Sequence, residues 1–170
     1  NMIRELVEKE RPDFISITGD IVSGQSWDRR QERFWELHHH NLAKVLKEAN
    51  VPWGIVPGFH DFEADANTEE MMRFEGHHEL SLTRHNFYEH YGEGLHHQFT
   101  YVLPVHNHRN TGAIDARIYF FGTGRADCLG AGGNDCIRRD QIEWFKDESD
   151  SIPADDPKRA NGIAFMHHAL

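Results

Sequence analysis

Three apolar stretches of the sequence are each followed at once by side chains that can bind a metal ion or move a proton. The stretch 14–18 runs into Gly19-Asp20, the stretch 51–56 runs through Pro57-Gly58-Phe59 to His60-Asp61, and the stretch 163–166 runs into His167-His168. Imidazole nitrogens and carboxylate oxygens are common metal ligands, and both groups act as general acids and bases. The residue types therefore indicate metal-assisted or acid–base chemistry.

The first two stretches are predicted to be parallel strands of a layered α/β fold. Between them we expect a long helix from about Arg30 to Ala49, and its inward face comprises Phe34, Leu37, Leu42, Val45 and Leu46. Strand, helix, strand is a βαβ unit, whose crossover makes the two strands parallel. Neighbouring strands lie about 4.8 Å apart, and ligands of open α/β sheets bind beyond their carboxyl ends. We therefore predict that Asp20, His60 and His167 converge at one strand edge.

The remaining elements follow from periodicity and from turn residues. We expect helices at Met2–Glu10, at 68–76 with Thr68 as a cap, and from about Arg138 to Glu148, with a further short segment at Asn86–Tyr91. Gln98–Val105 and Asp115–Phe121 alternate as a hairpin would. The glycine-rich loop from Gly124 to Cys136 is predicted to lie beside the strand edge that carries Asp20, because glycines allow close approach to a ligand.

Length and composition fit a single globular domain over residues 1–170. The chain has 38% hydrophobic residues and lacks a run of about 18 apolar residues, so no membrane span is expected. Its 28 acidic and 18 basic residues give a net charge of −10, which disfavours nucleic acid as a partner. The same charge repels a phosphate ester unless bound cations reverse the sign locally.

The spacing of the three strand ends resembles that of the calcineurin-like metallophosphoesterases, which include the purple acid phosphatases. Gly19-Asp20 is similar to the G-D block of that family, Gly58-Phe59-His60-Asp61 to its G-N-H-D block, and the stretch from Phe165 to Ala169 to its ligand-histidine block. The stretch from Gln141 to Phe145 also resembles a helix of eukaryotic members.

This resemblance implies a layered α/β/β/α sandwich that hydrolyses phosphate esters with two divalent metal ions, Fe, Zn or Mn. It implies that Asp20 and His167 are metal ligands. It also implies that His60 is the catalytic group that protonates the leaving group or stabilises the phosphoryl oxygens, with Asp61 holding the His60 ring.

Two substitutions depart from the family pattern. Phe59 stands where the family has a metal-ligating asparagine, and Ala169 stands where it usually has proline. The sequence also begins after the place of the first block of the family, Asp-x-His or Asp-x-Gly, and stops before the last, Gly-His-x-His. Phenylalanine offers no lone pair to a metal ion, so the 170-residue chain alone is expected to hydrolyse phosphate esters negligibly.

Two hypotheses therefore stay open. In one, the chain is the central part of a metal-dependent phosphoesterase. In the other, it is a non-catalytic relative that lacks a working metal site and keeps a structural role or binds a protein partner. Metal content would distinguish the two.

The other histidines and the two cysteines indicate less. The run His38-His39-His40 lies inside the long predicted helix, where successive side chains point in different directions, and His77-His78, His96-His97, His106 and His108 are expected at the surface. Cys128 and Cys136 form either a disulfide or two buried free thiols. A disulfide would indicate an oxidising compartment such as the extracellular space or the lysosome.

Overall fold

A computed structural model describes residues 2–30, 33–84, 99–109, 112–123, 136–153, 155–156 and 158–168. The chain divides into two compact units, Asn1–Thr83 and Arg84–Leu170. Each unit is a mixture of helices and strands, as expected for an α/β protein. No helix in the described part of the chain is long and apolar enough to cross a membrane.

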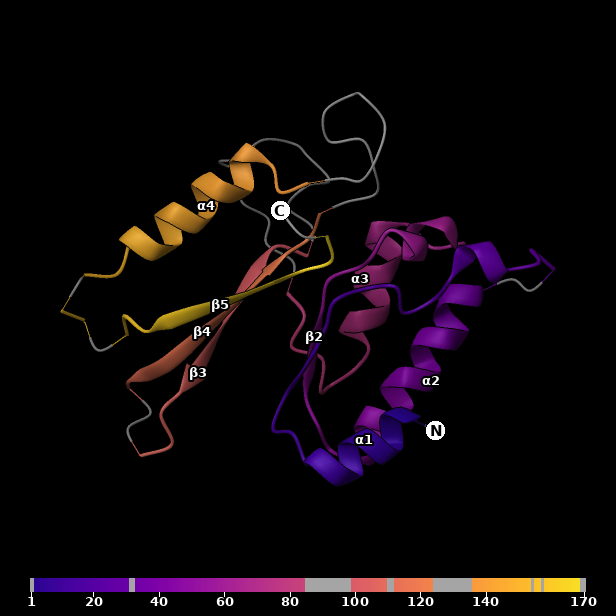
Figure 1. The fold of residues 1–170 in the computed structure, drawn as a ribbon, viewed down its shortest axis with the longest axis horizontal. Helices are drawn as coiled ribbons and strands as arrows, with labels where there is room; N and C mark the ends of the chain where they lie inside the picture. The colour runs from indigo at the N-terminus through magenta and orange to yellow at the C-terminus, as the bar shows by residue number, and fades with distance from the viewer. Residues whose placement is uncertain are drawn as a thin grey trace. The chain divides into compact units, whose positions relative to one another are not determined.

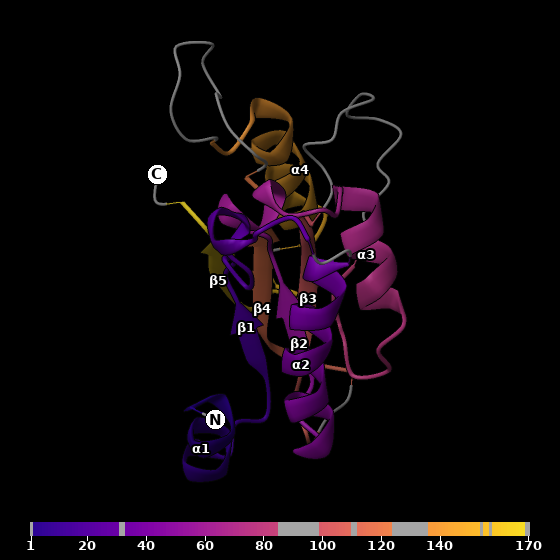
Figure 2. The ribbon, with the colours of Figure 1, turned by 90° about the vertical axis from the view of Figure 1, so that its right-hand side faces the viewer.

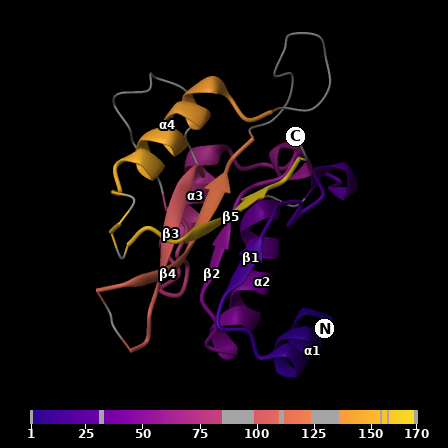
Figure 3. The same ribbon diagram turned by 60° about the vertical axis from the view of Figure 1, so that its left-hand side comes forward.

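The first unit contains the predicted βαβ arrangement. Helix α1 (Met2–Glu10) precedes strand β1 (Ile15–Ile17), helix α2 (Phe34–Glu48) and strand β2 (Trp53–Ile55). Strands β1 and β2 pair in parallel, with Ile15 opposite Trp53 and Ile17 opposite Ile55. Figure 3 shows the two strands side by side, with α1 near the start of β1. The prediction of adjacent parallel strands is confirmed.

Helix α2 buries part of the predicted face together with residues that were not predicted. Phe34, Val45 and Leu46 are buried as expected, but Leu37 is 44% exposed. Trp35, His39 and Ala43 are buried instead. The predicted face includes Leu37 only because it is apolar. In the structure His39 lies on the inward face instead, where it contacts the buried carboxylate of Glu75 on the next helix.

Helix α3 (Thr68–Gly76) completes the first unit and lies along α2 in Figure 2. Its cap is Asn67 rather than the predicted Thr68. The Asn67 side chain accepts from the Glu70 amide at 3.0 Å, while the Glu70 carboxylate accepts from the Asn67 amide at 2.9 Å. This reciprocal pair is a capping box, which fixes the start of the helix one residue earlier.

In the part of the second unit that the structure describes, a three-stranded sheet is covered by helix α4 (Arg139–Asp150) (Figure 1). Strands β3 (Tyr101–His106) and β4 (Ile114–Phe121) form the predicted antiparallel hairpin, and β5 (Asn161–Met166) pairs with β4 in parallel. Helix α4 (Arg139–Asp150) packs Trp144 against Tyr119 and Phe121. The segment predicted at 86–91 and the loop at 124–135 lie outside the described residues.

Gln141 joins α4 to the sheet of the second unit. Its side chain is fully buried, and its Nε2 donates to Thr100 Oγ1 and to the Gly122 carbonyl, both at 2.7 Å. Its Oε1 accepts from the Arg138 amide at 2.8 Å. Without Gln141 these three polar groups would lose a hydrogen-bond partner. One side chain therefore satisfies polar groups both at the start of α4 and next to the sheet.

Candidate functional site

The ends of β1 and β2 bring Asp20 and His60 together, forty residues apart in the sequence. The His60 amide donates to Asp20 Oδ1 at 3.0 Å. Asp20 adopts the left-handed conformation at φ 53°, directly after Gly19 at φ 94°, and this tight turn directs the chain out of β1. Aspartate tolerates this conformation better than most residues. The predicted meeting of Asp20 and His60 is therefore confirmed.

Asp61 makes a second connection between the same two turns. Its side chain is fully buried, with Oδ1 accepting from the Val22 amide at 2.9 Å and Oδ2 from the Gly58 amide at 2.8 Å. Burial raises the pKa of the Asp61 carboxyl, and the hydrogen bonds from these amides offset only part of that rise. The turn after β1 thus accepts a hydrogen bond from the turn after β2 and also donates one to it.

Glu63 holds the His60 ring. The prediction that Asp61 holds this ring is wrong. His60 Nδ1 lies 2.8 Å from Glu63 Oε2, and since a carboxylate only accepts, Nδ1 carries the proton. The hydrogen bond that His60 donates to Glu63 raises the pKa of His60. Burial lowers this pKa by less than the hydrogen bond raises it, and the negative charges of Glu63, Asp20 and Asp61 add to the rise.

The sequence did contain a signal for Glu63. Residues 60–63 form a 3-10 helix, η2 (His60–Glu63). Such a helix has three residues per turn, so side chains at positions i and i+3 lie one above the other. The prediction for this stretch names only His60 and Asp61, so it misses Glu63, three residues after the histidine.

A second short helix, η1 (Gly24–Ser26), packs against η2. An added Cβ at Gly24 would lie 2.4 Å from the backbone carbon of Glu63 and 2.6 Å from the Ala64 amide nitrogen, so this contact requires glycine. Gln25 Nε2 also lies 3.5 Å from Glu63 Oε1. The carboxylate that holds His60 is therefore itself positioned by the loop after β1.

Phe59 immediately precedes η2. Its ring meets the His60 ring edge-on, with centroids 5.4 Å apart. An aromatic ring has no lone pair, so the side chain packs against the candidate catalytic histidine without offering a ligand.

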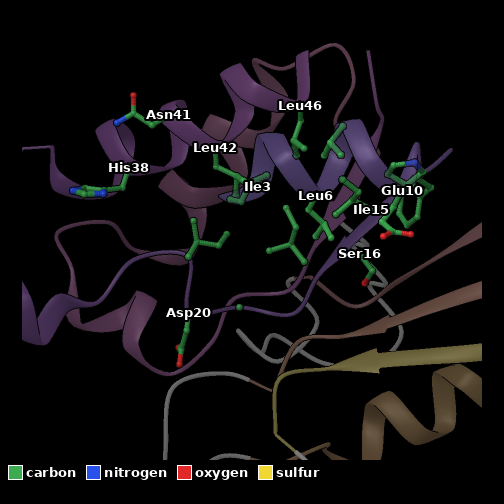
Figure 4. Close-up of a pocket in the computed structure, with 16 residues that line it drawn as sticks. Ile3, Leu6, Glu10, Ile15, Ser16, Asp20, His38, Asn41, Leu42 and Leu46 are labelled. Carbon is green, nitrogen blue, oxygen red and sulfur yellow. The ribbon is translucent and has the colours of Figure 1, made fainter. Parts of the chain in front are cut away.

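An apolar cavity of about 710 Å³ lies between α1, β1 and α2, and Asp20 lies at one end of it. Figure 4 shows the side chains of Ile3, Leu6, Leu42 and Leu46 around this space, while the Asp20 carboxylate is directed away from them. The cavity and the polar strand ends are thus separate features of the first unit.

His167 follows β5 in the second unit, as its place in the sequence predicts. Its ring meets that of His168 edge-on at 4.5 Å between centroids. Because Asp20 and His60 belong to the first unit, the convergence of His167 with them stays a prediction. Cys136 is disulfide-bonded, and Cys128, the other cysteine of the sequence, lies outside the described residues.

The donor atoms around Asp20 do not by themselves fit a pair of metal ions. Asp20 Oδ1 and both oxygens of Asp61 accept backbone hydrogen bonds, His60 Nδ1 is bound to Glu63, and Phe59 contributes no donor. Among the described residues, no group of three or more His, Cys, Asp and Glu side chains is placed to hold a metal ion.

Comparison with known proteins identifies the class. The family model described as calcineurin-like phosphoesterase matches residues 1–170, and the chain belongs to that family. Its mixed α/β structure is consistent with the metallophosphoesterase fold. Members generally use divalent metals and act on phosphate esters.

One curated relative is similar over part of the chain. It is a protein of Arabidopsis thaliana named probable inactive purple acid phosphatase 28, 36% identical over 72 residues. The match covers 42% of this chain and 17% of that protein. No solved structure gives a significant match.

Proposed function

We propose that the domain to which this chain belongs hydrolyses phosphate esters with divalent metal ions, and that the site includes Asp20, His60 and His167. The observation that supports this best is the pair of hydrogen bonds joining the two strand-end turns, His60 amide to Asp20 and Val22 amide to Asp61. Placing a carboxylate and a histidine together in this way costs ordering entropy, and it is the arrangement expected where ligands bind α/β sheets.

In this proposal His60 is the catalytic residue. Glu63 fixes its tautomer by accepting from Nδ1, so Nε2 is the nitrogen that faces the phosphate ester. The raised pKa keeps more of the imidazole protonated at neutral pH, which suits a group that stabilises phosphoryl oxygens or gives a proton to the leaving alkoxide. General acid catalysis of this kind typically contributes about 10²- to 10⁴-fold.

Asp61 acts through the backbone in the same proposal. Its two oxygens accept from amides of the turns after β1 and β2, so it positions the turn that carries His60 without touching the imidazole. Asp20 and His167 are the proposed metal ligands, since carboxylate and imidazole both bind the iron, zinc or manganese ions used in such sites.

A second function is supported by Phe59. A phenylalanine at a ligand position, packed against His60, is what a domain would show if it had lost hydrolysis and kept its sheet for a structural role or for binding a protein partner. The curated name of the Arabidopsis relative, probable inactive, is in keeping with this alternative.

Metal content and phosphatase rate of variants at position 59 test the proposal. In a polypeptide that supplies the first and last sequence blocks of the family, Phe59→Asn is expected to raise both, because it returns an oxygen donor next to His60. Phe62→Asn, on the 3-10 helix that follows Phe59, is the matched control and is expected to raise neither.

Three outcomes are informative. A rise confined to Phe59→Asn supports a hydrolytic site impaired by Phe59. Absence of metal and turnover from all three proteins supports the non-catalytic alternative. Full metal loading and activity in the unaltered protein, with no change in Phe59→Asn, would show that position 59 is not the lost ligand.

A further inference from the structure

Glu75 is a buried carboxylate that has no part in the proposed chemistry. It lies on α3, and only 1% of the residue is exposed. A charged carboxylate in such a place is costly unless several donors surround it. The groups that donate hydrogen bonds to Glu75 therefore indicate which parts of the first unit its charge stabilises.

Four side chains donate to Glu75 from three separate places. His39 Nε2 reaches it from α2, Trp53 Nε1 from β2 at 3.2 Å, and the hydroxyls of Ser81 and Thr83 from the segment after α3, the latter at 2.8 Å. A carboxylate has enough lone pairs to accept all four bonds, whereas a carboxylic acid or an amide does not.

The segment at 80–83 is attached to β2 as well as to Glu75. The Trp53 amide donates to the Leu80 carbonyl at 3.1 Å, and the Leu82 amide donates to the Trp53 carbonyl at 2.7 Å. Thr83 Oγ1, which donates to Glu75, accepts from the Ile55 amide at 3.1 Å. Glu75 thus stabilises one flank of β2, the strand that leads to His60.

We propose that Glu75 is an acid-sensitive lock of the first unit: while ionised it holds β2 between α2 and the segment 80–83, and its protonation releases that segment. The charged and titratable groups around it are His39 in direct contact and, beyond, His78, whose ring lies 5.2 Å from that of His39, with His40 and Lys47 near His78.

The direction of the pH effect follows from these contacts. Burial favours a higher pKa for Glu75, but the hydrogen bonds from His39, Ser81 and Thr83 outweigh it and lower the pKa below its usual range. A carboxyl group of lowered pKa stabilises the fold above its unfolded value, about 4.3, and that stabilisation is lost as the pH falls through the lower folded value. The lock is therefore closed at neutral pH and opens in acid.

His78 contributes to acid sensitivity in a different range. Burial lowers its pKa, followed by the positive charge of His39, so its protonation opposes folding as the pH falls below about 6.5. This effect remains when Glu75 is replaced. A loss of protection that sets in as the pH falls below about 4.3 and disappears in Glu75→Gln consequently belongs to Glu75.

Hydrogen exchange of the Ile55 and Leu82 amides tests the lock, with protection factors measured from pH 7 to 3. In Glu75→Gln the protection at pH 7 is expected to fall about ten-fold or more, and the further fall below about pH 4.3 is expected to vanish, while the fall due to His78 remains. Glu79→Gln, a nearby exposed glutamate, is the matched control and is expected to follow the unaltered protein.

A milder variant covers the case in which Glu75→Gln does not fold. Thr83→Val removes one donor to Glu75 and also the acceptor of the Ile55 amide, so the readout is Leu82, whose protection is expected to fall while amides of β4 stay unchanged. Equal protection of Leu82 in Thr83→Val and the unaltered protein would overturn the proposal. So would an acid fall in Glu75→Gln equal to that of Glu79→Gln.

Discussion

Gly24 lies so close to the backbone of η2 that any side chain there must push the two segments apart. An added Cβ would lie 2.4 Å from the Glu63 backbone carbon and from its Cβ. Comfortable contacts between carbon atoms begin at about 3.5 Å, so Gly24→Ala requires a displacement of about 1 Å. Backbone atoms cannot rotate away as a flexible side chain does, and the whole of η2 must therefore move.

The cost of this displacement follows from the known effects of overpacking. One methyl group forced into a close-packed contact destabilises a protein by about 1–3 kcal/mol. For a chain of this size each kcal/mol lowers Tm by about 2–4 °C, so Gly24→Ala is expected to lose about 2–12 °C. Because His60 and Glu63 both lie on η2, their hydrogen bond is displaced together with the helix.

Gly76 provides the matched control. It is the last residue of α3, and an added Cβ there would meet nothing within 4 Å. Alanine favours helix over glycine by about 1 kcal/mol, so Gly76→Ala is expected to be neutral or stabilising. Urea unfolding followed by circular dichroism measures both variants. If Gly24→Ala unfolds at the same urea concentration as the unaltered protein, the close contact of η1 with η2 is wrong.

Three further predictions concern single contacts. In the metal-free protein, an NMR titration should place the pKa of His60 above about 6.5, and Glu63→Gln should move it down, because the hydrogen bond and charge of Glu63 favour the imidazolium; a pKa unchanged by the substitution would contradict the pairing. Gln141→Leu should destabilise the protein by about 2–4 kcal/mol because it leaves buried polar groups without partners. Its control, Glu143→Gln, only removes an exposed ion pair and should change the unfolding free energy by less than about 1 kcal/mol. Asp65→Ala should cost about 1–2 kcal/mol, since its carboxylate accepts from the first two amides of α2 at 2.8 and 3.0 Å; an unchanged urea midpoint would show that water replaces this cap.

The local sequence pattern was enough to predict most helices and strands and the place of the strand ends. The apolar stretches around Ile15 and Ile55 are too short for helices and end at glycine or proline, so they had to be strands, and the helix between them required a parallel pairing. Once the pairing is parallel, residues that follow the two strands meet at one edge. The contact between Asp20 and His60 was predictable for that reason.

Which polar groups pair depends on how the elements pack, and the sequence pattern does not contain that information. Asp61 is adjacent to His60 in sequence, but neighbouring side chains diverge, and the one-turn geometry of η2 gives the imidazole to Glu63 instead. His39 is one of three successive histidines in α2, and the sequence does not single it out. The packing of α2 against α3 buries His39 against Glu75. A hydrogen bond between residues 36 positions apart depends on how two helices rotate about their axes, and local periodicity fixes that rotation only to within the width of an apolar face.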